Sequence, residues 1–478
     1  MCLSLLYSVF EAIGPLVGAS FATATWLVAS IRPPLGRILG AVRHLARLGN
    51  GAFHLFAFYL AVAWGPRLAW SIPGWALALA ALLLLGALAT FRRTQQNLRI
   101  PIALPVGIII LASLLGWLRE EGFARCDDYH RLRTQSGLEI LFPSTDEFTR
   151  CEPGQSFPIL RYPRKIWESP DSRRYVVTTT ISSDPRTRNQ PHRGGGSYDG
   201  LFCEVRADGS GRPHCVGGVS GKTHQVDVIE PRGELFSCAW GLDPDGRGRG
   251  KRSAIFRLSQ QEPLEILEEH SIYGTFAMYG FYDPATDEYH TLTDECGPIL
   301  SFRGSDFATR PALPVADCPG ATIYDAARNE GVMCGGMMGF VAFRLDPWRH
   351  RIIGRKNNPS GRLWLSWGCD WDPVGRAVYA LVPNLGILAV IDYDTGMVRQ
   401  THFVGFALRT VAFDAPRHLV YLSDFLGGDV IAIDANTGNE VNRWFAGHYL
   451  RELRIARDGK KLLTASNLGI VRIDLEDL

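Results

Sequence analysis

The C-terminal part of the chain repeats itself, from residue 366 to the end, with a period of about 42 residues. Trp371-Asp372 recurs as Phe413-Asp414, Tyr379 as Tyr421, Ile391-Asp392 as Ile433-Asp434, and Thr395-Gly396 as Thr437-Gly438. A period of roughly 40 to 50 residues in segments that alternate apolar and polar positions is typical of four-stranded propeller blades. The repeat therefore predicts an all-β propeller for the larger part of the protein.

The number of blades follows from the turn that ends the first strand of each repeat, where an acidic residue precedes Pro, Gly or a charged turn. Such turns occur at Glu168, Glu230, Asp283, Asp325, Asp372, Asp414 and Asp458. They predict seven blades over residues 161–478. The last blade has no outer strand of its own, so an upstream strand should complete it. Residues 137–142 and 157–162 are the two candidates, and the second is favoured because it leads directly into the first blade.

Three segments resemble the YVTN-type β-propeller repeat over residues 360–478. They are Asp392-Tyr-Asp-Thr-Gly, Asp434-Ala-Asn-Thr-Gly and Asp458-Gly-Lys-Lys-Leu-Leu. The resemblance implies a seven-bladed, WD-repeat-like fold and an extracytoplasmic binding role. Proteins of this family differ widely in function, so it implies no catalytic residue.

The N-terminal part is apolar and basic, with eight Arg and a single acidic residue, Glu11, among residues 1–118. Four segments without charged residues have the length of about 20 residues that crosses a bilayer. They are 12–31, 48–66, 70–91 and 100–118. The sequence thus predicts a helical membrane anchor over 1–118, followed by a linker over 119–160. The preference for Arg over Lys is typical of a bacterial protein.

Arginines between the spans predict the orientation of the chain. The loops 32–50 and 92–99 are rich in Arg, and the positive-inside rule places such loops in the cytoplasm. With four spans, everything after residue 118 then lies outside the cytoplasm, whereas three spans would invert this orientation.

Cysteine usage points to the same side of the membrane. Nine of the ten Cys follow the last span without zinc-type spacing, which favours disulfides in an oxidising compartment. The expected pairs are Cys203 with Cys215, Cys296 with Cys318, and Cys126 with Cys151. Cys238, in mid-strand, is expected to be a buried small apolar residue.

Basic residues gather on the propeller face that is formed by the loops between the second and third strands of each blade and by the loops entering each first strand. Two long loops and two positions one repeat apart make up the set: Arg186, Arg188, Arg193, Arg247, Arg249, Lys251, Arg252, Arg409 and Arg451. Arginine offers paired donors to carboxylate and phosphate, so these residues form a candidate anion site at the mouth of the tunnel. The alternative is that the Gly-rich basic loops are simply solvated.

Catalytic signatures do not emerge from the sequence. The histidines are scattered, and only His224 and His448 share a face as weak metal candidates. No nucleophile motif and no cofactor are predicted. Near-neutral charge over the whole chain argues against nucleic-acid binding.

Two main hypotheses follow. The first is a membrane-tethered extracytoplasmic binding or scaffold module, whose partners are the lipid bilayer and a protein or anionic ligand. The second is a propeller enzyme, either a lactonase-like hydrolase or a quinoprotein-like oxidoreductase, with a tunnel-centred metal or cofactor. A sensory subunit that signals through a partner is a third reading.

Overall fold

The computed structural model describes fourteen segments of the chain. They are residues 123–159, 162–180, 202–216, 222–229, 233–240, 252–273, 277–293, 297–315, 321–334, 340–355, 368–382, 386–405, 408–425 and 427–476. All belong to one compact unit, Gly122–Leu478. The four predicted spans lie outside these segments, and no helix within them is long and apolar enough to cross a membrane.

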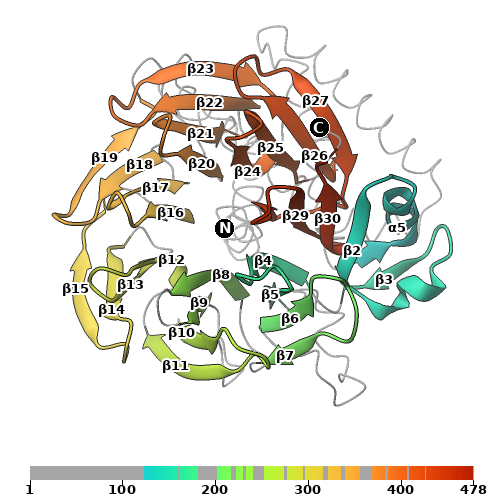
Figure 1. Ribbon diagram of the computed structural model, residues 1–478, viewed down its shortest axis with the longest axis horizontal. Helices are drawn as coiled ribbons and strands as arrows, with labels where there is room; N and C mark the ends of the chain where they lie inside the picture. The colour runs from blue at the N-terminus through green and yellow to red at the C-terminus, as the bar shows by residue number, and fades with distance from the viewer. Residues whose placement is uncertain are drawn as a thin grey trace, which may run out of the picture. The chain divides into compact units, whose positions relative to one another are not determined.

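Seven antiparallel blades follow one another around a ring in chain order (Figure 1). Blade 1 contains β4 (Tyr162–Glu168), β5 (Arg174–Thr180), β6 (Phe202–Arg206) and β7 (His214–Val216). Blade 2 contains β8 (Lys222–Ile229), β9 (Glu234–Trp240), β10 (Arg252–Ser259) and β11 (Ile266–Tyr273). Blade 3 contains β12 (Ala277–Asp283), β13 (Glu288–Thr293), β14 (Ile299–Arg303) and β15 (Thr309–Leu313). Blade 4 contains β16 (Ala321–Asp325), β17 (Glu330–Cys334), β18 (Phe340–Arg344) and β19 (Arg349–Ile353).

The three remaining blades include the sequence repeat. Blade 5 contains β20 (Cys369–Asp372), β21 (Ala377–Val382), β22 (Ile387–Asp392) and β23 (Val398–Phe403). Blade 6 contains β24 (Leu408–Asp414), β25 (Leu419–Asp424), β26 (Asp429–Asp434) and β27 (Glu440–Phe445). Blade 7 contains β28 (Glu452–Ile455), β29 (Lys461–Ser466), β30 (Gly469–Asp474) and, from far upstream, β2 (Leu138–Pro143). The seven-bladed prediction is therefore confirmed.

Blade 7 is closed by the candidate that the sequence ranked second. β2 pairs antiparallel with β30, so that Ile140 faces Val471, and the preference for residues 157–162 was wrong. Phe157 instead pairs with Ala124 through β3 (Ser156–Pro158) and β1 (Phe123–Arg125). Tyr162 is already the first residue of the innermost strand of blade 1, so it is not available for closure.

Repeated turns show why the repeat builds identical hairpins. In blade 5 the backbone N–H of Thr395 donates to Asp392 at 2.7 Å, and Gly396 follows with a φ of 71°. In blade 6 Thr437 donates to Asp434 at 2.7 Å, and Gly438 has a φ of 73°. Glycine adopts this left-handed conformation without steric strain, so both turns form with the same geometry.

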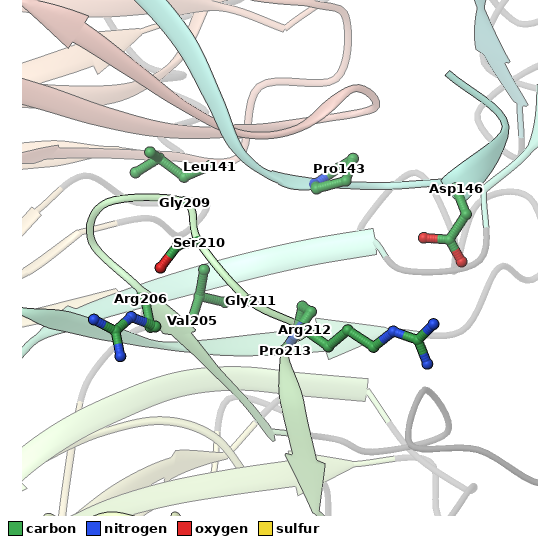
Figure 2. A pocket seen from close by; sticks show the side chains of 10 residues that line it. All are labelled: Leu141, Pro143, Asp146, Val205, Arg206, Gly209, Ser210, Gly211, Arg212 and Pro213. Carbon is green, nitrogen blue, oxygen red and sulfur yellow. The ribbon is translucent and has the colours of Figure 1, made fainter. Parts of the chain in front are cut away.

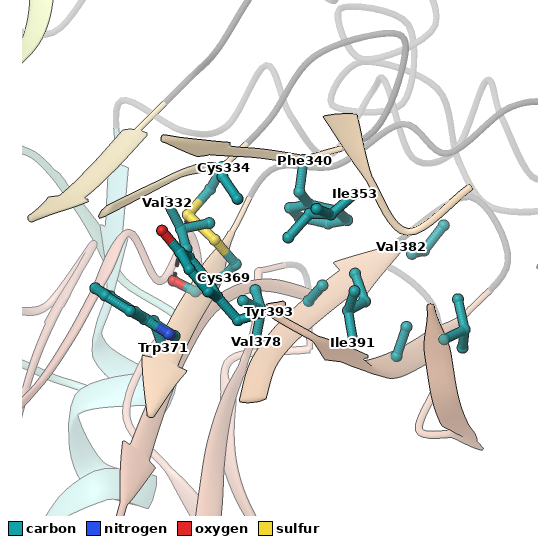
Figure 3. Close-up of a cluster of buried hydrophobic side chains, with 14 residues drawn as sticks. Val332, Cys334, Phe340, Ile353, Cys369, Trp371, Val378, Val382, Ile391 and Tyr393 are labelled. Atoms are coloured by element: carbon teal, nitrogen blue, oxygen red, sulfur yellow. Dashed lines mark hydrogen bonds between the residues drawn. A yellow bond between two sulfur atoms is a disulfide. The ribbon is translucent and has the colours of Figure 1, made fainter. Parts of the chain in front are cut away.

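The core is divided into clusters that lie between neighbouring blades. Figure 3 shows the cluster between blades 4 and 5, where Trp371 and Val378 of blade 5 pack against Val332 of blade 4. Tyr393 stacks on Trp371 with ring centroids 4.8 Å apart. Burying one such large side chain contributes about 1.5–3 kcal/mol, so the packing between neighbouring blades contributes substantially to their stability.

Three disulfides are present in the described part of the chain. Cys126–Cys151 and Cys203–Cys215 confirm two of the expected pairs. Cys334–Cys369 was not foreseen, and it links β17 of blade 4 to β20 of blade 5 (Figure 3). Cys296 and Cys318 lie outside the described residues. Cys238 is fully buried in β9, as expected.

A small module precedes the ring and docks on blades 6 and 7 (Figure 1). It contains β1, α5 (Cys126–Arg133), η2 (Asp146–Arg150) and β3, and the Cys126–Cys151 disulfide ties α5 to the segment after η2. The Gln135 side chain both donates to and accepts from the backbone of Phe445, at 2.9 Å each way. β27 is the outermost strand of blade 6, and these two bonds satisfy backbone groups at its outer edge.

Candidate functional site

Two arginines of the predicted anion site come together at the inner rim of the ring. Arg409 lies in β24 and Arg451 immediately before β28, the innermost strands of blades 6 and 7. Both guanidiniums lie over the ring of Phe425, at 4.7 Å and 5.2 Å from its centroid. A guanidinium within about 6 Å of a ring centroid is attracted by the negative face of the ring.

A third arginine, Arg164 of β4 in blade 1, extends this arrangement. Arg451 is also 5.0 Å from the ring of Tyr162, and Arg164 is 5.3 Å from the same ring. Cations and rings thus alternate through three consecutive blades. We call Arg409, Phe425, Arg451, Tyr162 and Arg164, in this order, the axial ladder.

The ladder is rigidly supported by its surroundings. The Tyr162 hydroxyl donates to the carbonyl of Tyr449 at 3.2 Å, which ties blade 1 to the loop before β28. The ring of Phe425 makes an edge contact with the ring of Tyr449, with centroids 5.5 Å apart. The two rings that hold the guanidiniums are therefore fixed by one buried tyrosine.

Burial sets the electrostatics of the ladder. Desolvation lowers the pKa of Arg451 to about 9 and that of Arg409 to about 10. Burial also lowers the pKa of Arg164, which is opposed by Tyr162 and Tyr279. The values for Arg409 and Arg451 remain above neutral pH, so these two side chains stay charged, and a bound anion would relieve the cost of their burial.

Tyr279 shows that the ladder faces the centre of the ring. It lies in β12 of blade 3, yet it interacts electrostatically with both Arg164 of blade 1 and Arg409 of blade 6. Blades 3 and 6 are on opposite sides of the ring (Figure 1). The three side chains therefore face a common central region.

Residues next to the ladder along the inner strands have mixed charge. Lys165, the neighbour of Arg164, donates to Glu452, the neighbour of Arg451, at 2.5 Å. Asp370 of β20 accepts from the backbone N–H groups of Trp371 at 2.8 Å and Phe413 at 2.7 Å. Desolvation, opposed by these two backbone hydrogen bonds and aided by Asp372 and Glu452, raises the pKa of Asp370 to about 6.

The other predicted members of the anion site cannot be placed. Arg186, Arg188, Arg193, Arg247, Arg249 and Lys251 lie outside the described residues, and only the backbone of Arg252 is described, at the start of β10. Their contribution stays a prediction.

The two histidines considered for a metal are not shown to meet. His448 lies 3.4 Å from Asp128 of α5, so it contacts the N-terminal module. His224 lies in β8, where side chains are outside the description. Within the described segments, no group of three His, Cys, Asp or Glu residues could hold a metal ion.

Acidic residues at the strand turns have structural partners. Asp283 accepts from Thr286 at 2.6 Å and from the Tyr324 hydroxyl of the next blade at 3.3 Å. Asp414 accepts from Arg417 at 2.9 Å and from Tyr421 at 3.2 Å. These bonds show that the carboxylates stabilise the turns from which the blades were counted.

Two surface grooves offer an alternative location for a ligand. The first, of about 440 Å³, lies between β2 and the β6–β7 hairpin (Figure 2). The second, of about 640 Å³, lies where blades 7 and 1 meet at their strand turns. Arg206, which lines both, pairs with Asp208 at 3.4 Å, and Asp208 also accepts from Ser210. Charges that satisfy each other within the groove make both grooves weaker candidates than the axial ladder.

Arg164 was not among the predicted site residues, because the predicted start of blade 1 was wrong. Residues 157–162 were favoured as the closing strand, so the segment Tyr162-Pro-Arg-Lys was not aligned with the inner strands of blades 6 and 7. The available signal was that Arg164, like Arg409 and Arg451, lies near the beginning of an inner strand.

Comparison of the sequence with protein-family models and with curated proteins finds no match, so the fold and the axial ladder are the basis for assigning a function.

Proposed function

We propose that this protein is a membrane-tethered, extracytoplasmic binding module that recognises an anionic ligand or an anionic group of a protein partner at the axial ladder. The observation that supports the proposal is the convergence of three partly buried arginines from three blades, held by the rings of Phe425 and Tyr162. Arginine side chains that are already held in position before the ligand binds lose little conformational entropy on binding. Each guanidinium can also donate two parallel hydrogen bonds to a carboxylate or phosphate.

Other observations support the proposed location of the propeller and its proposed relationship to YVTN-type propellers. Three disulfides in the described segments favour an oxidising compartment. The apolar, Arg-flanked segments before residue 118 support four spans with the propeller outside the cytoplasm. The repeated Asp-x-x-Thr-Gly turns of blades 5 and 6 support a relationship to YVTN-type propellers.

Anion binding is tested by calorimetric titration of the full-length, detergent-solubilised protein with inorganic phosphate. We expect binding to the native protein and a loss of affinity of at least 10-fold in Arg451→Gln. Arg349→Gln is the matched control, because Arg349 is exposed in β19, the outermost strand of blade 4, and lines neither surface groove. If phosphate binds equally to all three proteins, the axial ladder is not the anion site.

Orientation is tested by fusing reporters to the C-terminus. Alkaline phosphatase should be active there, because it matures only outside the cytoplasm, and a green fluorescent protein exported in the unfolded state should be dark. The opposite pair of results would contradict the extracytoplasmic location.

A further inference from the structure

The axial ladder is a chain of contacts in a fixed order, and this order constrains what can bind. Each ring has one arginine on either side of it in the series, with Phe425 between Arg409 and Arg451, and Tyr162 between Arg451 and Arg164. The three charges are therefore arranged in a row along the inner rim. A single small anion contacts one guanidinium or two adjacent ones, and leaves the end of the row unused.

The three arginines belong to successive blades, so the row follows the curve of the ring. β24, β28 and β4 are the innermost strands of blades 6, 7 and 1, and blades 7 and 1 are neighbours at the point where the ring closes (Figure 1). A ligand that reaches from Arg409 to Arg164 must pass Arg451. It must consequently have charge at intervals along its length.

Neighbouring side chains restrict where anionic groups can lie. Glu452 follows Arg451 in the chain, and its carboxylate interacts electrostatically with that of Asp370. Lys165 pairs with Glu452 at 2.5 Å, so the carboxylate of Asp370 is the group that would repel an anion moving away from the ladder in this direction. The anionic groups of a ligand are thereby kept in the row of arginines.

We propose that the ligand of the axial ladder is a linear oligo-anion, a chain of linked phosphate or carboxylate groups lying along the row from Arg409 to Arg164. This inference depends on the proposed anion-binding function and goes beyond it by naming the class of ligand. Linked phosphates and linked carboxylates present the same chemistry to arginine, so both sources belong in the test.

The test measures the affinities of the full-length protein for orthophosphate, linear triphosphate and a short poly-glutamate peptide, by calorimetry at one fixed salt concentration. Linear triphosphate should bind at least 100-fold more tightly than orthophosphate. Tight binding of the peptide as well would show that linked carboxylates also fit, and selective binding of triphosphate would restrict the class to linked phosphates. Both results support a linear ligand.

Arg164 is the decisive position, because it is the end of the row that only an extended ligand reaches. Arg164→Gln should lower triphosphate affinity far more than orthophosphate affinity, so that the ratio of the two falls below about 10-fold. Arg164→Lys keeps the charge and should retain an intermediate ratio, which separates a lost contact from a misfolded variant. Arg349→Gln, at an exposed position of β19 in blade 4, should keep the native ratio.

The remaining outcomes overturn one proposal or both. Equal affinities for orthophosphate and triphosphate, with orthophosphate binding still sensitive to Arg451→Gln, would refute the linear ligand and leave the anion site intact. An affinity ratio unchanged in Arg164→Gln would also refute it. Failure of every anion to bind the native protein would refute the anion site itself.

Discussion

Arg451 is the residue on which the axial ladder depends most, because its guanidinium lies over both Phe425 and Tyr162. A lysine at this position would keep the charge but lose the planar group that matches a ring face on one side and a carboxylate or phosphate at its edge. The position follows directly from the repeat, since Arg409 lies at the equivalent place one blade earlier.

The desolvated carboxyl group of Asp370 should make the stability of the protein depend on pH. Its pKa of about 6 is above the ordinary value of 3.8, so between these values the folded protein retains a proton that the unfolded chain releases. The free energy of unfolding should therefore fall as the pH rises from 3.8 to about 6, and remain lower above that. In Asp370→Asn this contribution should disappear. Urea unfolding of both proteins at several pH values between 4 and 7 provides the measurement, and parallel curves would contradict the assignment.

Some residue contacts could be predicted from the sequence and others could not. Asp392 and Asp434 could be placed in equivalent turns from the sequence, because an Asx turn with a following glycine is a local structure. The Cys334–Cys369 pair could not, since it depends on how blade 4 packs against blade 5. Arg164 was missed for a related reason, because blade 1 does not keep the spacing of the repeat.

Among the elements, β2 is the one that joins the two ends of the propeller. It supplies the outer strand of blade 7, and Phe142 and Leu141 pack in a cluster with Ile166 and Tyr175 of blade 1. The strand thus completes the sheet of blade 7 and also packs in the interface between blades 7 and 1, which we call the seam of the ring. The sequence predicted that an upstream strand closes the ring, but choosing between two strands of similar composition required the pairing itself.

Gly469, the first residue of β30, makes the closure sensitive to substitution. Its φ of 127° is a conformation reserved for glycine, and a Cβ there would lie 2.0 Å from the carbonyl oxygen of Phe142. Gly469→Ala should lower the free energy of unfolding by about 3 kcal/mol or more, because strain and clash add.

Gly154→Ala is the matched control for Gly469→Ala. Gly154 has a φ of 81°, and a Cβ there would meet nothing within 4 Å. It should lose only the conformational part, about 1 kcal/mol. Urea denaturation of the two variants decides the matter, and equal losses would show that β2 does not limit stability.

The whole molecule combines a stable ring with a destabilising centre. Six clusters of buried side chains lie between successive blades in the described segments, whereas the axial ladder places desolvated positive charges at the inner rim. Binding sites commonly lower stability in this way, because groups arranged for a ligand are not at their optimum without it.

Arg451→Met tests this relationship between stability and binding. Methionine has a similar length and no charge to desolvate, so the free energy of unfolding should rise by about 1–2 kcal/mol in the absence of a ligand. Phosphate should stabilise the native protein in thermal unfolding and leave the variant unaffected. A variant that is less stable by more than about 1 kcal/mol would mean that Arg451 has a mainly structural role.

The pairing of β2 with β30 also determines when the protein can finish folding. Glu139 of β2 bonds to Arg472 of β30, and these residues are 333 positions apart. At a synthesis rate of ~5–20 residues per second, roughly 15–70 s pass between the appearance of the first strand and that of its partner. During this time β2 is a strand with an open edge, exposed to any other chain that can pair with it. The seam that makes the finished ring continuous is therefore the last part to form, and the period before it forms is when the growing chain most needs protection from its neighbours.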